Sequence, residues 1–410
     1  MENSGRATFE QWRVVAMLVA CVLVNYLDRL NLSVANLDIA RDLNATPAEM
    51  GRLLSAFFIS YTGCLLLSGW LLDRFDVYKV LAFGFLVMSA ATALTAAIDG
   101  YAQLYVLRLA VGASAAIAFP AFSKIIAAGF RESQRGKANA LIDAGTKAAP
   151  ALIIVIGGLM LTRWSWRVLF ASLGLASLVW LPFWFRWRPR TLAVAKAAAI
   201  VHPPGFGELL SKRSVWGSFI GLYCLNSAWY FLITWFPAYL QTERHFSKAR
   251  MAMLGSIPFW LLAASTTLSG WAADRWIARG GNPTVVRKTF LVTGMLMCNL
   301  LFVAAVVPDD RAAIAIFTVA CATFGMTTSN HWGVTQTLAG PTAAGRWTSL
   351  QNAFGNLAGI AMPWITGEIV GRTKSFRLAF VLVAVLVTLG AVSYALVIGR
   401  VEQIRWRDAA

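Results

Sequence analysis

Ionisable side chains inside long apolar stretches are rare in this sequence, and the densest group lies near its start. The segment Asn25-Tyr26-Leu27-Asp28-Arg29 sets a carboxylate next to a guanidinium in otherwise apolar surroundings. Consecutive helical residues lie about 100° apart around the axis, so Asp28 and Arg29 point in different directions. Asn25 and Arg29 share a face, with Tyr26 beside it. A guanidinium can bind a carboxylate through two parallel donors. This face could therefore hold an anion while Asp28 faces another helix; a purely structural pairing of both charges is the alternative.

Three further charges fall inside apolar stretches, where each costs about 2.5–3.5 kcal/mol and is a candidate functional group. Arg108 either lines a binding cavity or extends along its helix to the membrane surface. Asp143 and Lys147 stand four residues apart on one helical face, so they form either a structural pair or part of a site. The central charges leave a surplus of one positive charge, with three cations against two anions: Arg29, Arg108 and Lys147 against Asp28 and Asp143. A cavity lined by them should favour an anion.

The second half of the chain carries neutral hydrogen-bonding groups in its apolar stretches instead. They are Asn226, Tyr230, Asn330, His331, Trp332, Gln336, Gln351, Asn352 and Asn356. Trp332 and Gln336 share one helical face, and Asn352 and Asn356 share another. Amide and indole groups could orient hydroxyl groups of a substrate. The alternative for the two asparagines is interhelical contact, because small residues spaced around them are typical of tightly packed membrane helices.

Long apolar segments must position these groups. Of the 410 residues 58% are hydrophobic and 13% charged, against about 25% charged in an average soluble domain, so a water-soluble fold is excluded. About 20 apolar residues span a bilayer as a helix. Twelve segments qualify, at roughly 13–35, 51–72, 78–98, 101–128, 137–161, 165–185, 214–240, 250–272, 288–307, 312–339, 345–370 and 377–399.

The sequence thus predicts an all-α polytopic membrane protein with twelve transmembrane helices in two six-helix, pseudo-symmetric bundles. The widest polar gap places one bundle at 1–185, a cytoplasmic linker at 186–213 and the other bundle at 214–410. With both termini cytoplasmic, inner loops hold roughly twice as many Lys and Arg as outer loops. The net charge of +17 therefore indicates basic membrane loops, with no nucleic acid as partner. The first apolar run lacks a small-residue cleavage site, so it is expected to remain as a helix.

A short motif occurs twice, half a chain apart, at the end of the second and the eighth segment. Its members are Gly69, Asp73 and Arg74, and then Gly270, Asp274 and Arg275. Glycine lets two helices approach closely, and Asp and Arg at a helix end can bond a neighbouring helix, so these residues are predicted to act in conformational gating. A single copy could merely fix the loop topology, but two copies in register indicate a duplicated transporter fold.

Two six-helix halves with Gly-x-x-x-Asp-Arg after helices two and eight resemble the major facilitator superfamily along the whole chain. After Arg74 the first copy departs from the usual pattern, with Asp76 where a Gly is common. Local strings resemble the anion:cation symporter branch, whose members commonly carry sugar acids and other organic anions. These strings are Asn25-Tyr26-Leu27-Asp28-Arg29, Asp143-Ala144-Gly145-Thr146-Lys147, Gln336-Thr337-Leu338-Ala339-Gly340-Pro341 and Gln351-Asn352-x-x-Gly355-Asn356.

The resemblance implies roles for particular residues. Arg29, Arg108 and Tyr61 would bind a carboxylate, Asp28 would take part in proton coupling, and Trp332 and Asn352 would contact the substrate from the other half. Many members carry a Glu seven residues after the arginine of segment four, where this chain has Ala115. Proton coupling would then rest on Asp28, together with Asp143, or transport would be uncoupled.

The leading hypothesis is import of a small organic anion, a sugar acid or related carboxylate, by proton symport with alternating access. The expected substrate ligands are Arg29, Tyr26, Tyr61, Arg108, Lys147, Trp332, Gln336, Asn352 and Asn356. A monomer in the bacterial inner membrane is expected. His202, His245 and His331 are scattered, so neither a metal site nor a prosthetic cofactor is predicted. An uncoupled facilitator or an efflux carrier is the alternative; an intramembrane enzyme, for which no paired catalytic acids stand out, and a receptor or scaffold are more distant ones.

Overall fold

The computed structural model describes residues 8–130, 132–188 and 204–406, and in these residues all regular structure is helical. The chain forms two compact units, residues 1–198 with 247–252 and residues 199–246 with 253–410. Part of the predicted linker, residues 189–203, lies outside the described residues. Each unit is considered by itself below.

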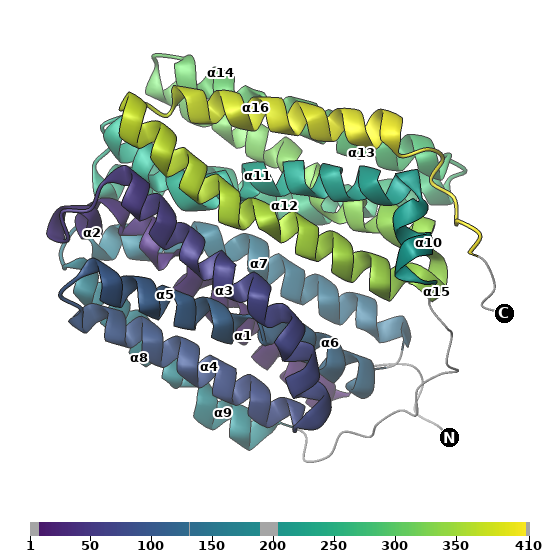
Figure 1. Cartoon of the computed structure of the whole chain (residues 1–410), viewed down its shortest axis with the longest axis horizontal. Helices are drawn as coiled ribbons and strands as arrows, with labels where there is room; N and C mark the ends of the chain where they lie inside the picture. The colour runs from purple at the N-terminus through teal and green to yellow at the C-terminus, as the bar shows by residue number, and fades with distance from the viewer. Residues whose placement is uncertain (1–7, 131, 189–203, 407–410) are drawn as a thin grey trace. The chain divides into compact units, whose positions relative to one another are not determined.

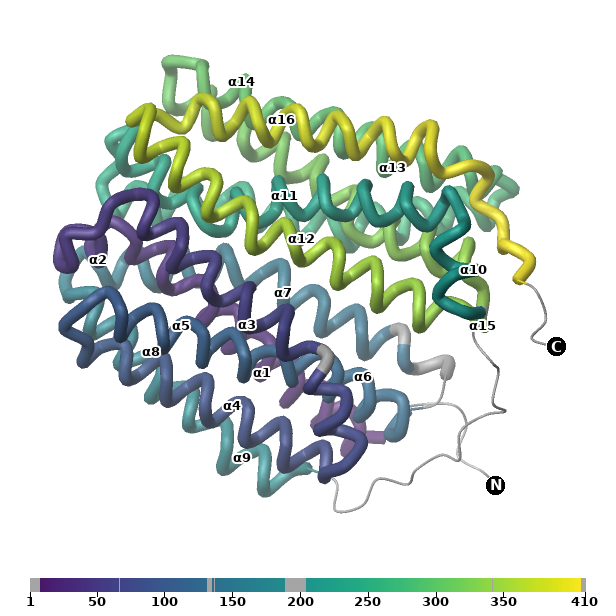
Figure 2. The backbone as a smooth tube through the Cα atoms, viewed as in Figure 1, coloured from purple at the N-terminus to yellow at the C-terminus, as the bar shows by residue number. Residues whose placement is uncertain are grey.

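The first unit contains nine α-helices and a 3₁₀ turn in its described part. They are α1 (Phe9–Val34), α2 (Asn36–Asp42), α3 (Pro47–Arg74), α4 (Val77–Leu94), η1 (Thr95–Ala97), α5 (Tyr101–Ala115), α6 (Ala118–Gly129), α7 (Glu132–Met160), α8 (Trp166–Leu178) and α9 (Trp180–Trp187). Helix α1 packs on α7, and α3 packs on α5. Helices α4 and α8 run side by side (Figure 2).

The second unit contains α10 (Phe206–Ser211), α11 (Arg213–Thr242), α12 (Lys248–Ala278) from Met253 onward, α13 (Pro283–Met297), α14 (Leu300–Val306), α15 (Asp310–Thr373), α16 (Arg377–Val392) and η2 (Ser393–Val397). Helix α11 packs against both α15 and α16 (Figure 1). Among the described residues ten helices are long and apolar enough to span a bilayer, and the bent α3 is an eleventh. The limb of α15 after its kink at Gly340 continues to Thr373 as a separate helix.

The kink in α15 has a physical cause and a covering segment. Gly340 adopts φ 62° and ψ −177°, a conformation that suits glycine, and Pro341 has no N–H to continue the hydrogen-bond ladder. The hydrogen-bond ladder of the helix is therefore interrupted beside the buried Leu338 and Ala339. The Ile404 N–H donates to Leu338 O at 2.9 Å, and the Trp406 indole donates to Ala339 O at 2.8 Å. The segment after η2 thus completes the turn between the two limbs.

The two units repeat one close helix crossing. In the first unit, a Cβ at Gly112 on α5 would overlap the Phe57 carbonyl oxygen and the Ser60 hydroxyl of α3. In the second unit, a Cβ at Gly325 on α15 would overlap the Ser265 hydroxyl of α12 and lie 2.7 Å from the Leu262 carbonyl oxygen. Both crossings set a glycine against a backbone carbonyl and a serine three residues later. The duplication therefore extends to helix packing, beyond the Gly-x-x-x-Asp-Arg motif.

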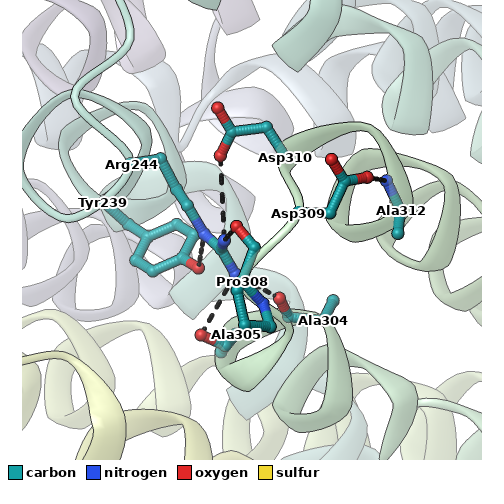
Figure 3. A network of polar contacts seen from close by, with 8 residues as sticks. All are labelled: Tyr239, Arg244, Ala304, Ala305, Pro308, Asp309, Asp310 and Ala312. Atoms are coloured by element: carbon teal, nitrogen blue, oxygen red, sulfur yellow. Dashed lines mark hydrogen bonds and ion pairs between the residues drawn. The ribbon is translucent and has the colours of Figure 1, made fainter.

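A polar clasp joins helix ends of the second unit, and Figure 3 shows the contacts that Arg244 makes in it. Arg244, which follows α11, donates to the Tyr239 hydroxyl at 2.8 Å, to backbone carbonyls at the end of α14, and to the Pro308 carbonyl at 3.4 Å. It also forms an ion pair with Asp310 at 3.7 Å. The preceding residue, Glu243, accepts a hydrogen bond from the N–H of Phe376 before α16. The ends of α11 and α14 are thereby tied to the start of α16.

The first unit has a matching clasp with other side chains. Asp42, at the end of α2, accepts hydrogen bonds from the Trp166 indole at 2.7 Å and the Arg167 guanidinium at 2.6 Å. Arg167 also donates to the carbonyl of Ile98, after η1, at 3.3 Å. These hydrogen bonds, that from Trp166 first, lower the pKa of Asp42 below its ordinary value. In both units an acidic residue that follows the first long helix thus accepts a hydrogen bond from the start of a later helix. Asp42 accepts from the start of α8, and Glu243 accepts from the residue before α16.

Candidate functional site

Arg29 on α1 lies in an aromatic surround. It is buried, and its guanidinium carbon lies 5.2 Å from the ring centre of Tyr26, 4.8 Å from Phe57, 4.6 Å from Phe58 and 5.7 Å from Tyr61. Such cation–π contacts hold the side chain in place without using its hydrogen-bond donors. The sequence predicted Tyr26 and Tyr61 as neighbours of Arg29, and the structure brings all three together. It missed Phe57 and Phe58, although the four-residue spacing of Phe57 and Tyr61 was a signal.

Arg108 on α5 is buried and reaches the same turn of α1 from the other side. Its Nη2 donates to the Arg29 carbonyl at 2.9 Å, and its Nη1 donates to the Asp28 carbonyl at 3.3 Å and to Asn31 Oδ1 at 3.4 Å. The alternative that Arg108 extends to the membrane surface is therefore wrong. These hydrogen bonds all go to α1, which suits a residue that positions Arg29. Gly112, one turn further along α5, lets the same helix approach α3 closely.

Asp28 faces away from Arg29, as its place in the helix predicted. Its side chain is fully buried, and the hydroxyls of Thr92 on α4 and Ser177 on α8 lie beside its carboxyl group. Among the described residues neither carboxyl oxygen makes a well-aligned hydrogen bond. The positively charged Arg108 contacts the backbone of Asp28. Asp28 is thus an ionisable group inside the first unit, linked to Arg29 through Arg108.

Helix α7 brings a second group to α1. A Cβ at Gly145 would lie 2.9 Å from Val22 Cγ1, so the two helices nearly touch there. The adjacent Thr146 is buried, and its hydroxyl donates to the Asp143 carbonyl at 2.7 Å. Asp143 is exposed and Lys147 half-buried. The pairing of Asp143 with Lys147 stays a prediction.

In the second unit the structure joins residues of α11 and α15. The Tyr230 hydroxyl donates to Asn356 Oδ1 at 2.6 Å, and Asn356 Nδ2 donates to the carbonyl of Asn352 at 2.8 Å and to its Oδ1 at 3.2 Å. Tyr230 and Asn356 are buried, whereas Asn352 is half-buried. Asn352 is therefore the member of this group that a ligand can reach, and Asn356 lies behind it.

The other predicted residues of the second unit are on the first limb of α15. The half-buried Trp332 ring lies 4.5 Å from the ring centre of the buried His331. Gln336, one turn further on, is exposed. Within the described part of the chain no cluster of three His, Cys, Asp or Glu could hold a metal ion.

The two copies of the repeated motif make different contacts. Asp73 forms an ion pair with Lys124 of α6 at 3.0 Å, and Lys124 also donates to the Leu72 carbonyl. Asp274 pairs with Arg287 of α13 at 2.7 Å, and Arg287 donates to Asn330 at 2.9 Å. Each acidic residue thus ties its helix to another helix of its own unit.

The remaining motif residues have less in common. A Cβ at Gly69 would meet open space, whereas one at Gly270 would lie 3.0 Å from the Ser329 hydroxyl. Arg74 is exposed, and Arg275 lies over the Trp271 ring at 5.5 Å. Close packing at the motif glycine is therefore found in the second copy only.

Comparison with known proteins decides the class. Residues 18–363 match the family model of the Major Facilitator Superfamily. The chain belongs to this superfamily. It is 28% identical to the probable galactarate/D-glucarate transporter GudP of Bacillus subtilis (strain 168), over 98% of this chain and 94% of that protein. It is 27% identical to the D-galactonate transporter of Escherichia coli O6:H1, over 98% of this chain and 99% of that protein.

The fold comparison agrees. The crystal structure of a bacterial homologue of the human lysosomal transporter Spinster, in an inward-facing and unoccupied conformation, superposes with a TM-score of 0.79 at 15% identity, over 96% of this chain and 98% of that one. The predicted all-α major facilitator fold is confirmed. The chain is a multi-pass membrane transporter and not an enzyme.

Proposed function

We propose that the protein imports a sugar acid or a related small carboxylate by proton symport with alternating access. The observation that carries this proposal is the buried Arg29 guanidinium, held by four aromatic rings and by the Arg108 contact to its own backbone. A planar guanidinium fixed in this way presents its donors as a fork that matches a carboxylate. Tyr26 and Tyr61 supply two of these rings, and we propose their hydroxyl groups as further ligands. The names of the two relatives support sugar acids as the substrate class.

Further ligands are proposed in each unit. In the second unit Asn352, Trp332 and Gln336 are accessible and would contact the hydroxyl groups of the sugar acid. Lys147 would add a positive charge near the carboxylate. Arg108 and Asn356 act behind the ligands instead of touching the substrate, because their hydrogen bonds go to Arg29 and Asn352.

Proton coupling would use Asp28. Thr92 and Ser177 hydroxyls beside it can donate to a carboxylate or accept from a carboxylic acid, so both protonation states can be accommodated. Protonation of Asp28 removes the negative charge nearest Arg108 and leaves two guanidinium groups unbalanced. An anion then binds more tightly, and by linkage a bound anion favours the proton. Asp143, which is accessible on α7, is a second candidate.

A second candidate function is uncoupled transport of the same anions. Ala115, where relatives of the anion:cation symporter branch commonly carry a Glu, is buried at the end of α5 and cannot bind a proton. Exchange of labelled for unlabelled sugar acid without any pH gradient, together with no uphill uptake under one, would favour this candidate.

The gating residues and the location belong to the same proposal. Asp73 with Lys124, and Asp274 with Arg287, would change partners as each unit moves; Gly69, Arg74, Gly270 and Arg275 complete the two motifs. We place the protein in the bacterial inner membrane as a monomer, with both termini cytoplasmic.

The test is uptake and binding by purified protein. Reconstituted protein should accumulate labelled D-galactonate, galactarate or D-glucarate under an inward proton gradient. Arg29→Lys keeps the charge but removes the fork, so the loss of one charged hydrogen bond should weaken binding about 10- to 150-fold. Arg163→Lys, at an exposed turn, is the matched control and should bind normally. Uptake that ignores the proton gradient would overturn coupling, and unchanged binding by Arg29→Lys would remove Arg29 from the site.

A further inference from the structure

We infer that Asn352 meets the substrate with its amide N–H₂ group and not with its amide oxygen, and that Tyr230 and Asn356 are positioning residues that enforce this orientation. The inference rests on the proposed function, because it specifies how the second unit recognises a sugar acid. In this orientation Asn352 is a hydrogen-bond donor to the substrate, so it selects for an acceptor oxygen there.

The orientation begins at a group whose polarity is fixed by chemistry. The backbone carbonyl of Asn352 can only accept hydrogen bonds. The Asn356 side-chain atom 2.8 Å from it must therefore be the N–H₂ group, Nδ2. The oxygen and nitrogen of an amide are assigned from their hydrogen-bond partners, and here the partner leaves one choice.

The donor and acceptor roles of Tyr230 and of the Asn352 side chain follow from this assignment. With Nδ2 committed, the other end of the Asn356 amide is Oδ1, which accepts from the Tyr230 hydroxyl at 2.6 Å. Tyr230 is therefore the donor. Nδ2 of Asn356 also lies 3.2 Å from the Asn352 side chain, so the atom facing it must be the acceptor Oδ1. Nδ2 of Asn352 is then the end of the amide that points away from Asn356.

Burial stabilises this orientation of the two amide groups. Tyr230 is 5% exposed and Asn356 is 4% exposed, so water has little access to replace either hydrogen bond. Turning the Asn356 amide over would set oxygen against oxygen at Asn352 and leave Nδ2 facing the Tyr230 hydroxyl. Turning the Asn352 amide over would set two N–H₂ groups against each other. Both arrangements lose buried hydrogen bonds, which is unfavourable.

The chemical consequence is a preference that can be measured. A hydroxyl, a carbonyl or a carboxylate oxygen of the substrate can accept from Asn352 Nδ2, whereas a carbon that lacks oxygen cannot. Wild-type protein should therefore bind hydroxy and keto forms of a sugar acid at the contacted carbon, and bind the deoxy form weakly.

Two substitutions separate orientation from simple packing. Asn356→Asp keeps the acceptor for Tyr230 but replaces the N–H₂ group, so the Asn352 amide should turn and present its oxygen outward. A hydroxyl can still donate to that oxygen, but a keto group cannot. The variant should bind the keto analogue at least tenfold more weakly while hydroxy sugar acid binding falls only a few fold. Tyr230→Phe should raise the dissociation constant a few fold and narrow the discrimination against the deoxy analogue.

The experiment measures dissociation constants for D-galactonate and its panel of mono-deoxy and mono-keto analogues by competition in proteoliposomes. Tyr223→Phe removes a hydroxyl from the same helix α11 and should leave all values unchanged. Equal losses for hydroxy and keto ligands in Asn356→Asp, or equal effects of Tyr230→Phe and Tyr223→Phe, would overturn the inference. Failure of wild-type protein to bind any sugar acid would instead refute the proposed function. Thermal unfolding of each variant identifies any that misfold, and where Asn356→Asp does, the comparison of Tyr230→Phe with Tyr223→Phe decides.

Discussion

The close crossing of α3 and α5 makes a quantitative prediction for Gly112→Ala. The added Cβ would lie 2.9 Å from the Phe57 carbonyl carbon and closer still to its oxygen, against about 3.5–4.0 Å for atoms in ordinary contact. The neighbour is backbone, which cannot rotate away as a flexible side chain could. Helix α5 must therefore move out by more than about half an ångström.

The energy of this movement can be set against the gain from alanine. Overpacking of this kind costs about 1–3 kcal/mol, and a clash with backbone belongs at the upper end. Alanine is about 1 kcal/mol more favourable than glycine inside a helix, which offsets part of this cost, so Gly112→Ala should lose about 2 kcal/mol of stability. Gly63→Ala on α3 has nothing within 4 Å of its new Cβ and should keep the whole gain. The two variants should therefore differ by about 3 kcal/mol.

Binding should respond together with stability. Arg108 lies one turn from Gly112, and two of its hydrogen bonds, at 3.3 and 3.4 Å, have little room to lengthen. Thermal unfolding in detergent, with and without a sugar acid, measures both effects. Gly112→Ala should unfold earlier and lose about tenfold in affinity. A midpoint equal to that of Gly63→Ala would refute the steric argument, and normal affinity in a destabilised variant would refute the link from α5 to Arg29.

Two further variants test the clasp and the coupling group. Hydrogen bonds from Trp166 and Arg167 lower the pKa of Asp42, so its stabilising contribution is complete above the unfolded carboxyl pKa of about 3.9 and is lost as the pH falls below it. Asp42→Asn should lower the free energy of unfolding at pH 7 by on the order of 1 kcal/mol or less, because the carboxylate is half exposed. The difference from wild type should shrink as the pH falls below about 3.9, and a difference that does not depend on pH would contradict this. Asp28→Asn should retain sugar-acid binding and exchange but lose uphill uptake driven by protons, and full accumulation by this variant would exclude Asp28 from coupling.

The sequence predicted the residues of α1 well because one helix fixes their geometry. Spacing alone places Tyr26 beside Arg29 and turns Asp28 in a different direction, and the structure has this arrangement. The role of Arg108 could not be predicted in the same way. Its partners are backbone carbonyls, which every residue has, and the contact depends on how closely α5 approaches α1.

The same limit explains what was missed elsewhere. Asn352 and Asn356 were predicted to share a face. The buried Tyr230, whose hydrogen bond to Asn356 marks that residue as the supporting one, comes from another helix. The two Asp residues of the repeated motif were predicted to be equivalent, yet one pairs with α6 and the other with α13. Sequence identity within a motif does not specify its neighbours, which belong to segments that diverged after duplication.

The covered kink of α15 has a consequence for biosynthesis. Ile404 and Trp406 follow α16 in the chain, so the ribosome delivers them after every helix of the second unit. Until then the buried carbonyls of Leu338 and Ala339 lack these partners, and the two limbs of α15 are joined by an incompletely bonded turn. The second unit therefore reaches its final packing only after the segment beyond α16 has emerged, and a nascent chain arrested before Ile404 should be open to proteolysis at this turn.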